Sequence, residues 1–138
     1  MASSVLFEQQ AVEWRHYAKA GKTCVRCSIT GKTVAEVVAD LREELEPQGV
    51  QVIYLESELP QEKLEQSNMI LFNGIPLEKL LVGAAASESA CLSCSCLTGT
   101  DAYCRTVEYE GVSYEEIPEE LIRQAAYAAL LPYNDAKR

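Results

Sequence analysis

The cysteines are the residues of this chain whose types and spacing most clearly suggest chemistry. All six lie in two short stretches of the 138-residue sequence. They are Cys24 and Cys27 in a CxxC pair, and Cys91, Cys94, Cys96 and Cys104 in the pattern C-x2-C-x-C-x7-C. A chain of this length with 48% hydrophobic residues can bury a core without cross-links, so the cysteines call for a chemical role.

The first pair lies in a positively charged stretch of an otherwise acidic chain. There is no Asp or Glu from position 14 to position 35, while five lysine or arginine residues fall there and the net charge of the chain is −9. Positive charge stabilises a thiolate, which is the attacking species in dithiol chemistry. We therefore predict Cys24 as the attacking thiolate and Cys27 as the resolving thiol, with Arg26 and Lys22 as electrostatic support. The same charge favours metal ligation by thiolates, and a structural pair is a third alternative.

The second cluster lies in a loop of small residues. Four thiolates at Cys91, Cys94, Cys96 and Cys104 suit zinc or an iron–sulfur cluster. A joint site with Cys24 and Cys27, a redox relay to that pair, and a loop disulfide that joins Cys91 or Cys94 to Cys104 are the alternatives. The pattern strongly indicates thiol chemistry but does not distinguish metal binding, a redox relay and a structural disulfide.

Few other residues suggest a site. His16 is the only histidine and could exchange a proton with a thiol, although its place in a predicted strand favours a partly buried ring with a satisfied hydrogen bond. Asp101 could help to bind a cation. A single histidine gives no Ser-His-Asp set, and Arg26 stands where a phosphate-binding GxxxxGK[ST] loop needs its first glycine. We therefore expect neither a hydrolase nor a nucleotide cofactor.

The elements that must position these residues follow from hydrophobic spacing. Thr33 and Glu36 form a capping box, which predicts a regular helix from Val34, and Pro47 and Gly49 end it. The first half of the chain is predicted as a strand at 11–17, this helix, a strand at 50–59 and a short helix at 60–66; the second strand is apolar on both faces up to position 55, as expected of a strand inside a sheet. A hairpin at 69–81, which turns at 73–74, follows. The chain then continues with a cysteine-rich loop at 83–102, a small hairpin at 106–117 and a helix from 118.

The predicted core follows from the same pattern. We expect Val12, Trp14 and His16 on one face of the first strand. The first helix should turn Val34, Val37, Val38, Leu41 and Leu45 inward, and the last helix Leu121, Ile122, Ala125, Ala126, Ala129 and Leu130. Pro118 near the start of the last helix, with Glu119 and Glu120 in its first turn, suits the amino end of a helix. Pro132 should stop it.

This order is a β-α-β unit, a short helix, a β-hairpin and a C-terminal helix. It resembles the thioredoxin-like superfamily, with a CxxC pair after the first strand and with a cysteine-rich insertion at about 84–105 and a small hairpin before the last helix. More closely, the chain resembles an uncharacterised prokaryotic domain family with a thioredoxin-like core. The stretches that carry this are WRHY, TCVRCSITGKT, NGIPLEKLL, CLSCSCLTG and CRTVEYEGVSYEEIPEELI. We expect one α/β domain over residues 1–138.

The chain departs from thioredoxin-like enzymes in two features that matter for disulfide exchange. In thioredoxin-like enzymes the active-site helix begins at the first cysteine, whereas the predicted start at Val34 is seven residues beyond Cys27. Those enzymes also carry a cis-proline before the third strand, where this chain has Gln66-Ser67-Asn68-Met69. The peptide-binding surface of a typical disulfide exchanger is not expected here.

Charge and hydropathy narrow the class of function. A net charge of −9 argues against nucleic acid and anionic membranes as partners. We expect no secretory signal, no membrane span, and a reducing cytoplasm as the compartment. The leading hypothesis is a thiol-disulfide oxidoreductase that acts on a redox protein partner, as a monomer or small homo-oligomer. The alternatives are a carrier of a soft metal or metalloid (zinc, copper, arsenic or mercury), or an interaction module with structural zinc.

Overall fold

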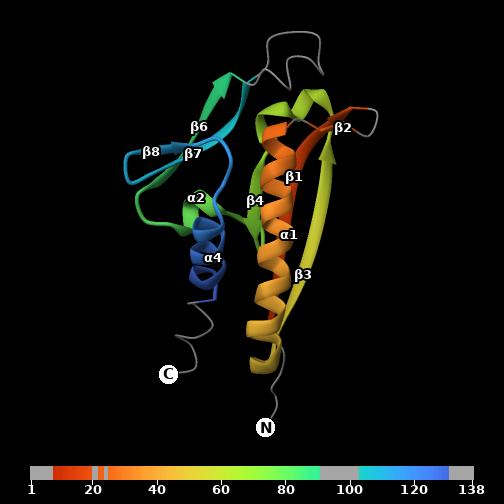
Figure 1. Cartoon of the computed structure of the whole chain (residues 1–138), viewed down its shortest axis with the longest axis vertical. Helices are drawn as coiled ribbons and strands as arrows, with labels where there is room; N and C mark the ends of the chain where they lie inside the picture. The colour runs from red at the N-terminus through yellow and green to blue at the C-terminus, as the bar shows by residue number, and fades with distance from the viewer. Residues whose placement is uncertain (1–7, 20–21, 24, 91–102, 131–138) are drawn as a thin grey trace.

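The computed structural model describes residues 8–19, 22–23, 25–90 and 103–130, which form a mixed α/β structure with two sheets (Figure 1). In chain order the elements are β1 (Glu8–Lys19), β2 (Lys22–Thr23), α1 (Val25–Leu45), the 3-10 helix η1 (Glu46–Gln48), β3 (Val50–Leu59), the 3-10 helix η2 (Gln61–Gln66), β4 (Met69–Phe72), β5 (Ile75–Pro76), α2 (Leu77–Leu80), β6 (Ala84–Ala90), β7 (Tyr103–Tyr109), β8 (Val112–Tyr114) and α4 (Glu119–Ala128).

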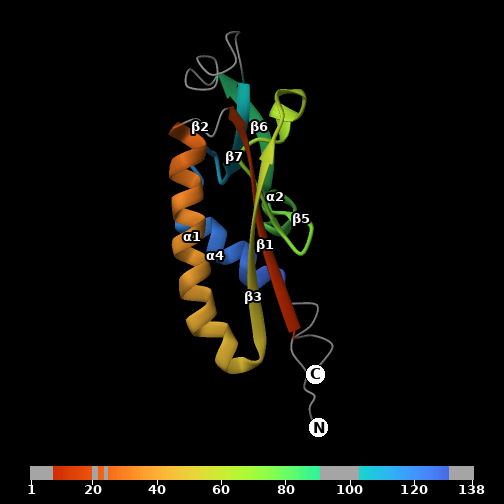
Figure 2. The same ribbon diagram turned by 90° about the vertical axis from the view of Figure 1, so that its right-hand side faces the viewer.

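The larger sheet is built around β1. Strand β3 pairs with β1 in parallel, β4 pairs with β1 antiparallel, and β5 pairs antiparallel with β4. Helix α1 makes the crossover between β1 and β3, as expected for a β-α-β unit, and lies against one face of the sheet (Figure 2). Helix α4 reaches the same face, since the side-chain amide of Gln10 donates to the Ala126 carbonyl oxygen at 2.6 Å.

The predicted core is confirmed almost throughout. Val12, Trp14 and His16 are all buried on one face of β1. All five inward positions of α1 are buried, and so are the expected positions of α4 except the half-buried Ala129. Helix α4 begins after Pro118 and has Glu119 and Glu120 in its first turn, as predicted. Pro132, the expected stop, lies outside the described residues, and the helix itself ends at Ala128.

The expectation that the strand at 50–59 is buried on both faces is wrong. Among the described residues β3 pairs only with β1, so it lies at an edge of the sheet. Leu55 is 47% exposed and Ile53 is half-buried. An apolar run alone therefore does not place a strand inside a sheet.

The predicted start of the first helix is also wrong. Helix α1 begins at Val25, nine residues before Val34. The Thr33 hydroxyl donates to the Ile29 carbonyl oxygen at 3.1 Å, so Thr33 lies inside the helix and does not cap it. Gly31 is tolerated there because the Trp14 ring packs against it, and a Cβ atom at Gly31 would lie 2.3 Å from that ring.

Both predicted turns are confirmed, but the second strand of the first hairpin, expected over 75–81, is strand only at Ile75–Pro76. Leu77–Leu80 form the helix α2, which follows Pro76 directly. Asn73 and Gly74 have φ angles of 53° and 84°, and Glu110 and Gly111 have φ angles of 52° and 82°. Positive φ at both central positions is the requirement of a type I′ turn. Strand β5, which contains Pro76, lies at the end of its sheet, as the proline predicted.

The second sheet contains a strand that the sequence pattern did not predict. Strand β6 lies in the segment expected to be loop and pairs antiparallel with β7 along its whole length, from Ala84 opposite Tyr109 to Ala90 opposite Tyr103. Strand β8 pairs with the other edge of β7. Val107 from this sheet joins the main core, so the two sheets share buried residues.

Candidate functional site

The first thiol pair lies at the amino end of α1. Arg26 and Cys27 are the second and third residues of the helix, and Cys24 immediately precedes its first residue, Val25, in the sequence. Cys24 itself, and the side chains of Arg26 and Cys27, lie outside the described residues. The backbone of α1 therefore fixes where Cys27 lies along the helix, while the reactivity of the pair stays a prediction.

The first turn of α1 suits a negatively charged group. It contains no acidic residue. The amino terminus of a helix carries unpaired N–H groups and the positive end of the helix dipole, both of which lower the pKa of a nearby thiol. The objection that the helix starts too far from Cys27 is removed by the observed start at Val25.

The contact between Gly31 and Trp14 fixes the register of α1 on β1. Cys27 lies one helical turn before Gly31, a rise of about 6 Å, and His16 lies two strand residues after Trp14, a rise of about 6.6 Å. Helix and strand run in opposite directions, because α1 returns the chain from the end of β1 to the start of the parallel strand β3. The backbone of Cys27 and the His16 ring therefore lie at the same level of the helix–sheet interface.

His16 has a hydrogen-bond partner, as the sequence led us to expect, and its ring is more deeply buried than the partial burial predicted. It is 3% exposed and stacks on Trp14 with ring centroids 4.0 Å apart and an interplanar angle of 17°. Its Nε2 atom lies 2.8 Å from Oε2 of Glu56. Sequence reasoning did not single out Glu56, because only the pairing register of β1 and β3 brings it next to His16.

One of the five basic residues near the thiol pair belongs to the opposite face of the sheet. The Arg15 guanidinium is paired with Glu13 at 2.9 Å and donates to Gln66 at 3.0 Å. The hydrogen bond from Arg15 chiefly, with a further one from Ser57 at 2.8 Å, holds the pKa of Glu13 below its usual value despite partial burial. Side chains alternate between the two faces of a strand, so Arg15 points away from the face of Trp14 and His16. Its guanidinium pairs there with Glu13.

The second cysteine cluster is described only in part. Cys91, Cys94, Cys96 and Asp101 lie outside the described residues, while the backbone of Cys104 lies in β7 opposite Ser89 of β6. The end of β6 and the start of β7 lie at the same end of the molecule as the amino terminus of α1 (Figures 1 and 2). Both segments that carry cysteines are thus anchored at one end of the fold.

The chain matches known proteins whose activity is not assigned. Residues 11–126 match a family described as "Domain of unknown function (DUF2703)". An uncharacterised protein of Archaeoglobus fulgidus is 33% identical over 118 residues, which cover 83% of this chain and 82% of that protein. No solved structure matches the chain. Among the described residues, no helix has the length and apolar character needed to cross a membrane.

Proposed function

We propose, from the premise that this chain belongs to the DUF2703 family, that it is a thiol-based redox protein with a thioredoxin-like core. Cys24 is the attacking thiolate, Cys27 the resolving thiol, and Arg26 the electrostatic support of the pair. One observation carries the proposal: α1 begins at Val25, so the CxxC pair spans the start of a long helix whose first turn has no acid.

The topology supports the thioredoxin-like part of the proposal. The strand order β3-β1-β4-β5, with β3 parallel to β1 and β4 antiparallel to it, is that expected from a β-α-β unit followed by a hairpin. The C-terminal helix α4 then packs on the face already covered by α1. The missing proline before β4 leaves the recognition of a peptide substrate to other residues.

The proposed reaction exchanges one disulfide for another. The Cys24 thiolate attacks a sulfur of the partner's disulfide and releases the other sulfur as a thiolate, which gives a mixed disulfide. The Cys27 thiolate then attacks Cys24 and displaces the second partner sulfur. The partner is reduced to a dithiol, the CxxC pair is oxidised, and a second dithiol protein must reduce the pair again. A reducing cytoplasm is the compartment that we propose for this cycle.

The cluster of Cys91, Cys94, Cys96 and Cys104 is proposed to hold zinc or an iron–sulfur cluster, or to pass reducing equivalents to the first pair. Strand β6 ends and β7 begins at the end of the molecule where α1 starts, which suits either role (Figure 1). A carrier of a soft metal or metalloid is the second candidate, because thiolates are the ligands that such ions prefer. That candidate needs all the thiols as ligands and no disulfide turnover.

The first experiment compares matched serine variants. Reduced protein is mixed with oxidised glutathione, and the release of reduced glutathione is followed. Cys24→Ser should abolish turnover, while Cys27→Ser should accumulate a mixed disulfide that mass spectrometry detects. Cys104→Ser is the control: if the second cluster holds metal, this variant should release reduced glutathione as the natural protein does. Full turnover in Cys24→Ser would reject the proposed role of this residue.

A second experiment separates the two candidates. Protein purified without oxygen is analysed for zinc, iron and sulfide, and its free thiols are counted before and after chelation. About one zinc, or an iron–sulfide complement, with only the first pair titratable, is expected for the redox proposal. Tight, exchangeable binding of metal with no disulfide turnover would favour the carrier.

A further inference from the structure

The register of β1 on β3 brings three ligand-type side chains to one face of the sheet. Trp14 lies opposite Glu56, and His16 lies opposite Glu58, in parallel pairing. Side chains two residues apart on a strand point to the same face, so the only histidine of the chain has two carboxylates beside it. None of these residues belongs to either cysteine cluster.

The geometry of this group is compact. The nearest ligand atoms of His16, Glu56 and Glu58 all lie within 4.8 Å of one another. The side chain of His16 is 4% exposed, whereas that of Glu56 is 47% exposed and Glu58 is also exposed. A buried imidazole held by its stack on Trp14 thus presents Nε2 to two carboxylates that face water.

We propose that His16, Glu56 and Glu58 bind a divalent transition-metal ion such as zinc, cobalt or nickel, with water in the remaining positions. Ligand bonds of about 2.1 Å place neighbouring ligands of a tetrahedral ion roughly 3.4 Å apart, so small rotations of the exposed carboxylates close the site. The ion takes the place of the hydrogen bond between Nε2 of His16 and Oε2 of Glu56.

Charge gives a reason for the ion to bind. Two carboxylates two residues apart on an edge strand repel each other, and the imidazole can supply at most one positive charge. Arg15, the basic residue between Trp14 and His16, lies on the opposite face and is paired with Glu13. A divalent ion bound by an imidazole and two carboxylates is neutralised by its own ligands, and this set of nitrogen and oxygen donors is typical of such ions.

The fold supplies its own reporter for a test. Trp14 is the only tryptophan of the chain, and it stacks directly on His16. Cobalt or nickel bound to His16 should quench the fluorescence of Trp14. Zinc has a filled d shell and should not quench it, so zinc that displaces cobalt or nickel should restore the Trp14 fluorescence. The titration uses the full chain with nickel chloride, and zinc chloride is added as the competitor.

The variants separate this site from the thiols. Glu56→Gln combined with Glu58→Gln should raise the nickel concentration at half-quenching roughly tenfold or more. His16→Asn should abolish quenching. Cys24→Ser combined with Cys27→Ser should leave it unchanged, and so should the matched control Glu46→Gln, in η1 beyond the carboxyl end of α1. The double glutamine variant alters only exposed side chains, so it tests the proposal even where His16→Asn disturbs folding.

Quenching that survives His16→Asn in a folded protein, or that is lost in the serine variant, would overturn the imidazole–carboxylate site. No quenching by cobalt or nickel at millimolar concentration would overturn it as well. Each of these results is independent of disulfide turnover, so the site and the thiol proposal can fail separately.

Discussion

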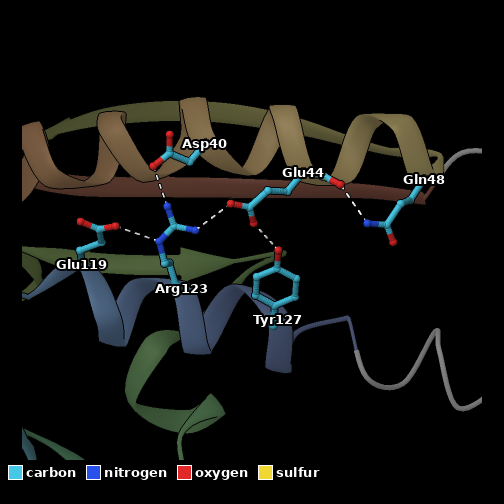
Figure 3. Close-up of polar contacts among 6 residues, drawn as sticks. All are labelled: Asp40, Glu44, Gln48, Glu119, Arg123 and Tyr127. Atoms are coloured by element: carbon cyan, nitrogen blue, oxygen red, sulfur yellow. Dashed lines mark hydrogen bonds and ion pairs between the residues drawn. The ribbon is translucent and has the colours of Figure 1, made fainter.

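The two halves of α1 share one apolar core but differ in the contacts that they add to it. The amino-terminal half packs Gly31 against the Trp14 ring, and the buried hydroxyl of Thr30 accepts from the Ile117 backbone N–H at 3.1 Å. The carboxyl-terminal half meets α4 through Arg123, which pairs with Asp40 at 2.6 Å and with Glu44 at 3.0 Å (Figure 3).

The difference shows where the fold tolerates change. Contacts in the amino-terminal half are buried and leave no space, so a small change in volume there must move a helix or a strand. The carboxyl-terminal half also buries Val37, Val38, Leu41 and Leu45, but its polar contacts lie among exposed side chains. Water and salt weaken ion pairs there. Both halves of α1 thus bury an apolar stripe; the end that carries Cys27 is also held in register by close packing on Trp14, while the other end adds polar contacts to α4 that can be replaced.

The largest change in packing is expected for Gly31→Ala. Its Cβ atom would lie 2.3 Å from the Trp14 ring, so the ring or the helix must shift. Overpacking of this kind costs about 1–3 kcal/mol, and the better helix propensity of alanine offsets up to about 1 kcal/mol of it. Urea unfolding measures the net change. Ser28→Ala, at an exposed position of the same helix, is the control and should be neutral or stabilising.

A stable Gly31→Ala protein with an unchanged Trp14 emission spectrum would contradict the claim that the amino-terminal half of α1 packs too closely on Trp14 to accept a larger residue. It would mean that the amino-terminal half of α1 yields as easily as the other half. A loss of stability accompanied by weaker cobalt or nickel quenching would instead show that the same packing also positions the His16 ring.

Two threonines in the amino-terminal half give the next effect. Thr30→Val keeps the shape of the side chain but leaves the buried N–H of Ile117 without its acceptor, which costs about 1–3 kcal/mol. Thr33→Val removes a hydroxyl that only donates to the Ile29 carbonyl oxygen, so we expect less than about 0.5 kcal/mol. Thermal unfolding of the pair gives the difference, and equal losses would show that burial of Thr30 is not the cause.

The sequence predicted the core of this fold better than its helix and strand ends. Hydrophobic spacing identified the buried stripe of α1, and the residue pairs Asn-Gly and Glu-Gly identified the places of the two turns, because both features depend on local sequence. It failed at the start of α1, since Gly31 and Thr33 resemble a helix boundary and only the packing of Trp14 shows otherwise. Strand β6, AAASESA, has no β-branched or aromatic residue, so pairing with β7 alone reveals it.

The candidate sites divide in the same way. The thiol pair and the buried His16 were visible in the sequence, because unusual residue types mark them. Glu56 and Glu58 were not, since exposed glutamates are common and only the parallel register of β1 and β3 sets them beside the imidazole. Arg15 was counted among the charges near the thiols, yet strand alternation turns it to the other face.

A smaller effect is expected where α1 meets α4. Arg123→Met removes pairs with Asp40, Glu44 and Glu119, the last at 2.9 Å, but the arginine is partly exposed and its partners more so. We expect a loss of about 1 kcal/mol or less at low salt, and almost none in 1 M salt, where charges are screened beyond about 3 Å. A loss that is unchanged by salt would show that Arg123 acts through packing of its stem.

The smallest effect, with a distinctive pH profile, is expected for Tyr127→Phe. The phenol donates to Glu44, and this hydrogen bond is the main cause that lowers the pKa of Glu44 and raises the pKa of Tyr127 (Figure 3). A lowered acid pKa stabilises the fold above the ordinary value of 4.5, and this is lost as the pH falls through the folded-state pKa. A raised tyrosine pKa stabilises below 10.0, and this is lost as the pH rises through the folded-state pKa.

The difference in stability between the natural chain and Tyr127→Phe should therefore form a plateau between these two values and shrink on both sides. Urea midpoints measured at intervals from pH 3 to pH 11 test this shape. The plateau should be lower than the loss caused by Arg123→Met, because one exposed hydrogen bond is removed instead of three ion pairs. A difference that does not change with pH would mean that the ring of Tyr127 contributes through packing on α1, and the carboxyl-terminal half of the helix would then resemble the amino-terminal half.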